Sequence, residues 1–501
     1  MADALVLVAP LRFEAAALRF RQPVARPRRC GMGPDRAHRT GAELAGGPDE
    51  PVAIAGVAGG LDPSLRPGQV VVATEVIGRR TTPLPGAMLL AAQLRRAGLD
   101  VVTGPIVSTQ KVARGRARRA LHEQSGAIAS DLESAWLVEA LDRSDHRAVA
   151  VTRVVVDTRQ HDLWSPRTVI EGARAARVLN RIAPVLHQWA DALGPRDVTL
   201  AGPRSFCAGV ERAIDVVRLA LDRFGAPVYV RRQIVHNSHV VHELESLGAV
   251  FVQELDEIPD GATVVLAAHG VAPAVRIVAN TRSRRVIDAT CPLVAKVHTE
   301  ARRYAREGYS IVLIGHDDHE EIEGTRGEAP ECIVVVENVD DVHALELPDP
   351  SRVAYLTQTT LALDETAAVV RALKERFPQA VGPRADDICY ASQNRQEAVR
   401  AIAASSDVIL VVGSVNSSNS NRLVEVACRA GCPAYLVDDE DDIDLAWLAS
   451  ARRVGISAGA SAPESLVSRI VDALETLGPV TTIEHAVTTE DVRFQLPAEV
   501  R

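Results

Sequence analysis

Aromatic residues are scarce in this sequence, where phenylalanine, tryptophan and tyrosine together make up 3% of 501 residues. So few rings argue against a broad surface on which nucleic-acid bases could stack. The net charge of −9 at pH 7 also argues against general binding to the phosphate backbone of nucleic acids. We therefore expect no nucleic-acid partner.

Cysteines are few as well, and their number, seven, is odd. A secreted disulfide framework would be denser and usually even-numbered. No apolar run approaches the roughly 20 residues that a membrane helix needs. The first residues are apolar, but they contain Asp3, Arg12 and Glu14 and lack a basic segment and a cleavage-type end, so they indicate a β-strand rather than a signal peptide. These absences predict a reduced, soluble protein of the cytoplasm without a transmembrane segment.

Hydrophobic residues, at 47%, are numerous enough for a full core, and the length predicts two to four domains at roughly 100–200 residues each. Residues 1–195 carry a net charge of +7, whereas the rest carries −16. This opposition indicates two domains with separate functions. A helix predicted at about residues 170–193 is terminated by Gly194 and Pro195, so we place the domain boundary there, between residues 1–195 and 197–501.

Short runs rich in β-branched residues alternate with helical patterns in both parts, including a helical stretch at 110–124. This alternation predicts an α/β protein with buried, largely parallel sheets, in which ligands bind beyond the carboxyl ends of the strands. The expected strands are 4–9, 52–60, 69–76, 147–157, 197–202, 227–232, 249–254, 262–270, 284–291, 310–319, 353–360, 407–414 and 433–439.

Three cysteines share a local context: Cys207 in SFCAGVERA, Cys291 in DATCPLVAK and Cys389 in DDICYASQN. Each follows an extended segment and precedes a helical pattern, so each thiol is expected at a helix N-terminus, where the thiolate and metal ligation are favoured. Three thiolates can hold an iron–sulfur cubane by three irons and leave the fourth iron open. An open metal position is typical of a catalytic site. The other four cysteines are interpreted as structural thiols.

Histidines and hydroxyl-rich loops follow other predicted strands. They include His236, His269 and the segment 316–319, and the loops at 413–423 and 455–466 each precede a helix. Neutral polar groups at helix N-termini, together with histidines, suit a diphosphate bound without Mg²⁺. No GxxxxGK[ST] motif is present that would indicate a nucleoside triphosphate.

The second part of the chain carries a long series of ordered motifs. In chain order they are PRSFCAGVERAI, IVHN, AAHGV, DATCPLVAKVH, IGHDDHEEIEGT, TQTTL, DDICYASQNRQ, GSVNSSNSNRL and SAGASAPE. Over residues 197–501 this series strongly resembles the LytB family, the 4-hydroxy-3-methylbut-2-enyl diphosphate reductases that catalyse the last step of the methylerythritol phosphate route to isoprenoids.

The resemblance implies a three-lobed α/β fold around a central [4Fe–4S] cluster bound by Cys207, Cys291 and Cys389. It implies reductive loss of an allylic hydroxyl as water, which gives isopentenyl and dimethylallyl diphosphate, with electrons from a ferredoxin or flavodoxin. The implied proton donor is Glu321, which acts with His319 and Thr359. The residues implied to bind the diphosphate substrate are His236, His269, His319, Thr359, Thr360, Ser417, Ser418, Asn419 and Ser461. Glu320 stands where the family usually has proline.

Other motifs lie in residues 1–195: APLRFEAAAL, CGMGPDRA, GVAGGLDPSLRPGQVVVATEV, ASDLESAWL and RVVVDT. They resemble the purine nucleosidase/phosphorylase superfamily, which implies a nucleoside phosphorylase-like α/β domain. By this resemblance Glu133 holds the ribose hydroxyls, Asp157 protonates the departing purine and Glu14 activates water, and such carboxyl groups suit glycosidic cleavage. Because no clear arginine motif for inorganic phosphate is present, hydrolysis is favoured over phosphorolysis. One hypothesis is release of adenine from an adenosylated hopanoid, since fusions often join steps of one pathway.

Alternatives remain for both parts. Residues 1–195 could form a non-catalytic docking or dimerisation module. The second part could be an iron–sulfur sensor without turnover, although Glu321 and Thr359 argue against this because a sensor needs no proton relay. It could also be a structural zinc protein, but its dispersed cysteines lack the paired spacing of such sites.

Overall fold

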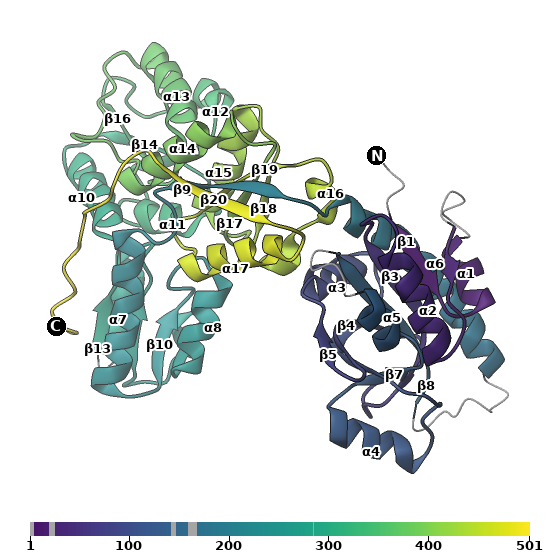
Figure 1. Cartoon of the computed structure of the whole chain (residues 1–501). Coiled ribbons are helices and arrows are strands. Elements are labelled where there is room, and N and C mark those ends of the chain that lie inside the picture. The colour runs from purple at the N-terminus through teal and green to yellow at the C-terminus, as the bar shows by residue number, and fades with distance from the viewer. Residues whose placement is uncertain (1–4, 20–25, 142–146, 159–167, 284) are drawn as a thin grey trace. The chain divides into compact units, whose positions relative to one another are not determined.

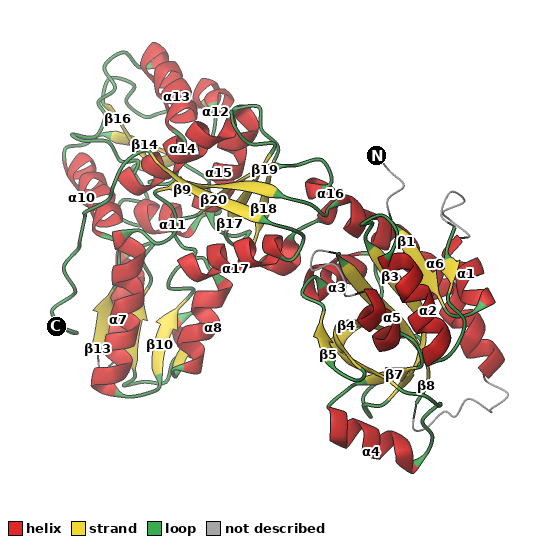
Figure 2. Ribbon diagram, in the orientation of Figure 1, coloured by secondary structure: helices red, strands yellow, loops and turns green. Residues whose placement is uncertain are grey.

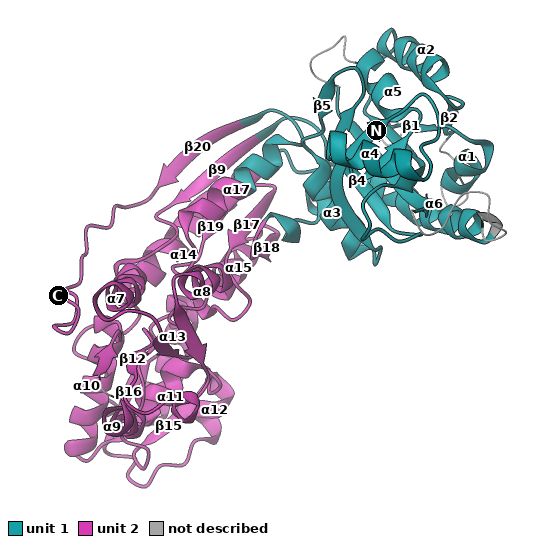
Figure 3. Cartoon of the chain, turned by 90° about the horizontal axis from the view of Figure 1, so that it is seen from below, with its two compact units in different colours: residues 1–196, 440–452, 470–480 teal, residues 197–439, 453–469, 481–501 magenta. Residues whose placement is uncertain are grey.

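Strands and helices alternate through the computed structural model, which describes residues 5–19, 26–141, 147–158, 168–283 and 285–501 (Figures 1 and 2). The chain divides into two compact units (Figure 3). The first contains residues 1–196, 440–452 and 470–480, and the second contains residues 197–439, 453–469 and 481–501. Two late segments thus belong to the first unit, which a single boundary after residue 195 does not anticipate.

The first unit is built on an eight-stranded mixed sheet of order β2-β1-β3-β7-β6-β4-β5, in which β8 pairs with both β3 and β4. Because β3, β7, β6, β4 and β8 pair in a ring, these five strands close on themselves as a small barrel. The strands are β1 (Val6–Ala9), β2 (Arg28–Arg29), β3 (Val52–Gly60), β4 (Val70–Ile77), β5 (Thr81–Pro83), β6 (Val101–Ser108), β7 (Ala129–Asp131) and β8 (Val149–Asp157). The helices are α1 (Arg12–Arg19), α2 (Pro34–Ala45), α3 (Ala87–Arg96), α4 (Arg116–Ser125), α5 (Ser134–Leu141), α6 (Thr168–Asp191) and α16 (Leu445–Leu448).

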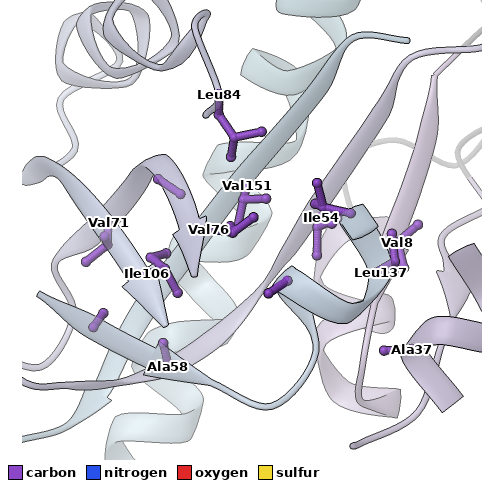
Figure 4. Packing of buried hydrophobic residues seen from close by; sticks show 14 of the residues in the cluster. Val8, Ala37, Ile54, Ala58, Val71, Val76, Leu84, Ile106, Leu137 and Val151 are labelled. Carbon is purple, nitrogen blue, oxygen red and sulfur yellow. The ribbon is translucent and has the colours of Figure 1, made fainter. Parts of the chain in front are cut away.

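The barrel strands supply the apolar core of the first unit. Ile54, Val76 and Val151 come from three strands and gather in one cluster (Figure 4). Each is at most 1% exposed. Strands buried on both faces have continuous rather than alternating apolar sequences, which is the pattern seen at 52–60 and 147–157. Three pairings, β3–β7, β4–β5 and β4–β8, are antiparallel, so this sheet is less parallel than the apolar runs predict.

The second unit contains three separate sheets, which together give the three-lobed α/β architecture. The first has the order β11-β10-β12-β13, the second β15-β14-β16 and the third β18-β17-β19-β9-β20. The strands are β9 (Arg196–Gly202), β10 (Val228–Arg231), β11 (Ala249–Val252), β12 (Thr263–Leu266), β13 (Arg285–Asp288), β14 (Ser310–Ile314), β15 (Ile333–Val336), β16 (Val353–Thr357), β17 (Val408–Val412), β18 (Ala434–Val437), β19 (Arg453–Ala458) and β20 (Val480–Ala486).

Helices follow these strands in the usual α/β rhythm, and most of them are amphipathic. They are α7 (Ala208–Phe224), α8 (Ser238–Ser246), α9 (Pro273–Arg282), α10 (Pro292–Arg306), α11 (Glu320–Arg326), α12 (Val339–Ala344), α13 (Leu363–Arg376), α14 (Tyr390–Ala403), α15 (Ser418–Arg429) and α17 (Glu464–Glu475). Short 3₁₀ turns lie at Leu255–Glu257 in this unit and at Glu440–Asp442 in the first unit. Among the described residues, no helix is both long and apolar enough to cross a membrane.

The predicted elements differ from the observed ones mainly at their ends. The helix predicted from residue 110 begins at Arg116, because Gly115 adopts a φ of 49° and caps it. The strands predicted at 262–270 and 310–319 end at Leu266 and Ile314, so the polar residues that follow lie in loops. Residue 4 of the first predicted strand, and Asp3 before it, lie outside the described residues.

Candidate active site

Three cysteines of the second unit begin three helices. Cys207, Cys291 and Cys389 are the N-cap residues of α7, α10 and α14, which confirms the predicted placement at helix N-termini. All three line one cavity, with apolar neighbours such as Val210 and Val294. Thiol groups from three distant segments are therefore brought to a single apolar wall.

The space beside these thiols is kept open by a glycine. A Cβ atom on Gly209 would lie 2.7 Å from Cys291 Sγ and 3.8 Å from Cys207 Sγ. Burial raises the pKa of Cys291 to about 12 and that of Cys389 to about 11. None of the seven cysteines, all of which are described, forms a disulfide. The thiols of Cys291 and Cys389 are thus protonated at neutral pH unless a cation replaces their protons.

Three histidines lie together in the same cavity. The rings of His236 and His269 stack with their centroids 4.0 Å apart, and His319 meets each of them edge-on. Burial lowers the pKa of His236 to about 2 and those of His269 and His319 to about 4. All three are therefore neutral at pH 7. His319 Nδ1 accepts a hydrogen bond from the Glu321 backbone N–H (3.1 Å), so the proton of its neutral ring is on Nε2.

Glu321 and Thr359 form a buried pair beside the histidines. Glu321 is 3% exposed, and its carboxyl group accepts two hydrogen bonds from Thr359, one from the backbone N–H (2.7 Å) and one from the hydroxyl (2.9 Å). Burial raises the pKa of Glu321 to about 7. Because this value is close to neutral, Glu321 can hold a proton in the cavity and release it.

Hydroxyl and amide groups line the remaining wall. Ser417 caps α15 and lies 3.3 Å from Ser461 by their Oγ atoms, and Ser461 donates to the His236 carbonyl oxygen (3.0 Å). The hydroxyl groups of Thr360 and Ser418 lie 2.9 Å apart. Asn419 also lines the cavity. No lysine or arginine occurs among the described residues that line it, so an anion would meet neutral donors there.

The first unit has a cavity of its own, in which the three carboxylates predicted from its sequence meet. Glu14 of α1, Glu133 before α5 and Asp157 at the end of β8 all line it. Glu14 accepts from the backbone N–H groups of Leu11 (2.6 Å) and Val57 (2.8 Å). Burial raises the pKa of Glu14, and it raises that of Glu133 to about 7.

Two buried arginines balance these carboxylates. Arg153, in the middle of β8, is 0% exposed and lies 2.6 Å from Asp131 and 3.7 Å from Glu133. Arg118 of α4 forms an ion pair with Asp157, and both side chains are almost fully buried. This pair favours the carboxylate form of Asp157.

A comparison with known families decides where the second unit belongs. Residues 198–475 match the family model described as LytB protein, which is more than half of the chain. The chain belongs to the LytB family. Residues 28–184 match the model of the phosphorylase superfamily, so a domain with that fold precedes the LytB part.

Relatives of the LytB part are named as reductases. A 4-hydroxy-3-methylbut-2-enyl diphosphate reductase of Mycobacterium bovis is 55% identical over 324 residues, which are 64% of this chain and 98% of the relative. One of Acidothermus cellulolyticus is 56% identical over 62% of this chain and 91% of the relative. The solved structure of the corresponding reductase from Plasmodium falciparum covers 61% of this chain and 97% of its own, with 37% identity and a TM-score of 0.59. The LytB part is thus an oxidoreductase.

Several residues of both cavities were not singled out from the sequence. Phe494 lines the LytB cavity, and Arg212 and Arg395 reach the backbone next to its cysteines. Arg153 could have been found from the sequence, because it places a charge in the middle of an apolar strand. Arg118 had none, since it lies in an arginine-rich helix that looks entirely solvent-exposed.

Proposed function

We propose that the LytB part reduces 4-hydroxy-3-methylbut-2-enyl diphosphate to isopentenyl and dimethylallyl diphosphate. The reaction consumes two electrons and two protons, breaks the C–O bond of the allylic hydroxyl and releases water. The observation that carries the proposal is one cavity in which three thiols, a carboxyl group with a pKa of about 7 and a wall of neutral donors converge. Each group corresponds to one requirement of the reaction: electron delivery, proton delivery and diphosphate binding.

The thiols of Cys207, Cys291 and Cys389 fit a [4Fe–4S] cluster. Thiolates are the ligands that iron–sulfur clusters prefer, and Gly209 leaves room beside two of these sulfur atoms. Replacement of the thiol protons by a cationic group would remove the cost of burying three thiolates. When bound by three cysteines, such a cluster supplies a Lewis-acidic iron and a path for electrons, which we expect from a ferredoxin or flavodoxin.

Glu321 is the proton source in this proposal. Its protonated form faces the cavity and is fixed by Thr359, so the proton can pass to a substrate hydroxyl that Thr359 also orients. His319, with Nε2 as its donor, is placed to stabilise the same oxygen as it leaves as water. The second proton adds to carbon, at either end of the allyl group, which accounts for two products.

The diphosphate is held by neutral donors. His236 and His269 offer imidazole N–H groups, and Ser417, Asn419 and Ser461 offer hydroxyl and amide groups. Thr360 and Ser418, hydrogen-bonded to each other, extend this wall. A diphosphate brings its own negative charge into this cavity, where neutral donors aligned at a helix N-terminus stabilise an anion.

The test uses the full chain purified without oxygen. The purified protein should be brown and contain about four irons per chain. It should convert the substrate to both products when reduced methyl viologen supplies electrons. A colourless protein that contains zinc would contradict the proposal and support a structural zinc site. A brown protein without turnover would support a sensor instead.

We also propose that the first unit hydrolyses a nucleoside. The buried carboxyl groups of Glu14, Glu133 and Asp157, which line one pocket, favour this function. Glu133 is suited to hold ribose hydroxyls and Glu14 to activate water, whereas Asp157 can protonate a purine only if Arg118 withdraws from it. The apolar residues Leu11, Met32 and Val112 in the pocket suit a nucleoside with an apolar substituent, such as an adenosylated hopanoid. If the purified chain releases no adenine from adenosyl substrates, the non-catalytic docking module is favoured.

A further inference from the structure

Residues 487–501, which we call the strap, run through the second unit between two anchors without forming a helix or strand. Figure 1 shows the strap as the last part of the yellow trace, between β20 and the end marked C. At one end, the Val487 backbone N–H donates to the Gly202 carbonyl oxygen (2.8 Å). At the other end, Val500 is 5% exposed and lies in the apolar core beside β10, with Leu496 packed against it. An irregular segment that is anchored at both ends is held in a defined path.

Between the anchors, the strap passes the three cysteines. Phe494 is half-buried and lines the same cavity as Cys207, Cys291 and Cys389. It is the one described residue of the strap that does so. Its neighbours Arg493 and Gln495 are exposed, so the aromatic ring is the part of this polar stretch that faces inward.

A fully buried arginine joins the strap to two of the cysteine loops. Arg395 lies on α14, the helix that begins after Cys389, and is 0% exposed. It donates to the carbonyl oxygens of Ser205 (2.7 Å) and Phe206 (3.2 Å), directly before Cys207. It also forms an ion pair with Glu490 at 3.0 Å, four residues before Phe494.

A second arginine makes the corresponding link on the other side of Phe494. Arg212 lies on α7, the helix that begins after Cys207. Its Nη1 donates to the carbonyl oxygens of Ala289 (3.0 Å) and Thr290 (3.1 Å), directly before Cys291. Its Nε donates to the carbonyl oxygen of Gln495 (2.7 Å). The two arginines thus tie the three cysteine loops to one another in pairs, and both tie them to the strap.

We propose that the strap closes the three-cysteine cavity with the Phe494 ring, and that Arg395 and Arg212 are positioning residues that keep the cysteine loops in place beneath it. The ring excludes water and oxygen from the sulfur atoms, because an aromatic side chain fills the space through which they would enter. The part that concerns the iron–sulfur cluster rests on the proposed reductase function, whereas the closure of the thiols does not.

The experiment compares Phe494→Ala with the wild-type full chain, both loaded with cluster without oxygen. Iron content should be equal before exposure to air. In air, the visible absorption of the Phe494→Ala protein should decay severalfold faster than that of the wild type. The matched control is Phe251→Ala, which removes a ring packed on the apolar core beside β10 that does not line the cavity. Equal decay rates in wild type, Phe494→Ala and Phe251→Ala would overturn the proposal.

Thiol alkylation of the cluster-free chain gives a second readout that needs no iron. Iodoacetamide should modify Cys207, Cys291 and Cys389 faster in Phe494→Ala than in wild type. The buried Cys30 and Cys432 report on general unfolding in the same sample and should not change. Unchanged rates at the three cysteines would overturn the closure. A wild-type chain that never binds iron, but shows the alkylation difference, would refute the reductase proposal alone.

Glu490→Gln keeps the inference testable if Phe494→Ala does not fold. This change leaves the ring in place and removes only the charge that pairs with Arg395. We expect a smaller increase in the same two rates, compared at a temperature well below the melting temperature of each protein. A Glu490→Gln protein that behaves as wild type in both assays would remove Arg395 from the positioning role.

Discussion

The two cavities of this chain both bury several ionisable side chains and both raise the pKa of a glutamate to about 7, but among the described residues only the cavity of the first unit also buries arginines against its carboxyl groups. In the LytB cavity the charge is removed: the histidines are neutral, and the pKa of Glu321 is raised to about 7. In the cavity of the first unit the charge is compensated, because Arg153 lies against Asp131 and Glu133, and Arg118 is paired with Asp157.

This difference indicates what each cavity can receive. A cavity of neutral donors and thiols contains no fixed ion pairs, so it suits ligands that bring opposite charges, as the proposed diphosphate and the cationic core of the proposed cluster do. A cavity whose carboxylates already have buried partners suits an uncharged ligand such as a nucleoside. The net charges of +7 for residues 1–195 and −16 for the rest do not reveal this distinction, because each cavity contains only a few of the charged residues that these sums count.

The largest effect is expected from Glu321→Gln in the LytB cavity. Glutamine keeps the hydrogen-bonding shape but has no proton to give, so turnover should fall by about 100-fold or more. Iron content and visible absorption should stay unchanged. Glu323→Gln is the matched control, since Glu323 is on the same helix but pairs with Arg232 outside the cavity. Near-normal turnover of the Glu321→Gln protein would remove Glu321 from the mechanism.

Charge compensation in the first unit is tested by Arg118→Met. This change leaves Asp157 buried without its partner, so the free energy of unfolding of the first unit should fall by about 3–5 kcal/mol. Adding Asp157→Asn should restore most of the loss. All four tryptophans belong to the first unit, so tryptophan fluorescence in a denaturant series follows that unit. Arg119→Met, at an exposed position of α4, is the control, and an equal loss in both variants would contradict the role of the pair.

The raised pKa of Glu321 predicts a pH dependence of turnover. Because the protonated form is the active one, turnover should be highest below about pH 7 and fall as the pH rises through the pKa. Well above that pKa, the fall should approach about tenfold per pH unit. Steady-state rates between pH 6 and 9 measure this, and Glu321→Gln should lose the dependence. A flat wild-type profile up to pH 9 would assign the proton to another group.

The smallest effect is expected from a single neutral donor of the LytB cavity. Ser461→Ala removes one hydroxyl, and a neutral hydrogen bond contributes about 0.5–1.5 kcal/mol. We therefore expect KM for the diphosphate substrate to rise about two- to tenfold with little change in kcat. The exposed Ser468 on α17 provides the control, Ser468→Ala. A rise in KM above 100-fold would mean that Ser461 contributes far more to diphosphate binding than a single neutral hydrogen bond does.

Local sequence patterns predicted much of the fold. The strand expected at 52–60 has those bounds in the structure, and the helix expected at about 170–193 is found at Thr168–Asp191. Such elements are predictable because their signals, continuous apolar runs and a Gly-Pro stop, lie within a few residues. The start of α4 was wrong by six residues, because propensity over 110–115 favours a helix that the backbone at Gly115 interrupts.

The sequence also predicted which types of residue the two sites contain. It did not predict which of their charged side chains pair with one another. The pattern strand–cysteine–helix placed Cys207, Cys291 and Cys389 at helix N-termini from local information alone. The ordered motifs indicated the LytB family, and the match to the family model then showed it. By contrast, the partner of Asp157 lies 39 residues away on a helix whose own pattern gives no sign of burial.

Sequence alone therefore determined the elements, the family and the chemical groups that the LytB cavity would contain. The tertiary structure decided which of these groups are neutral, which are paired and what covers them. Burial and contacts between distant segments set those properties, as Glu321 and the strap residue Phe494 illustrate. Neither burial nor contacts between distant segments can be read from a local sequence pattern, because both depend on atoms that the fold brings together from remote positions.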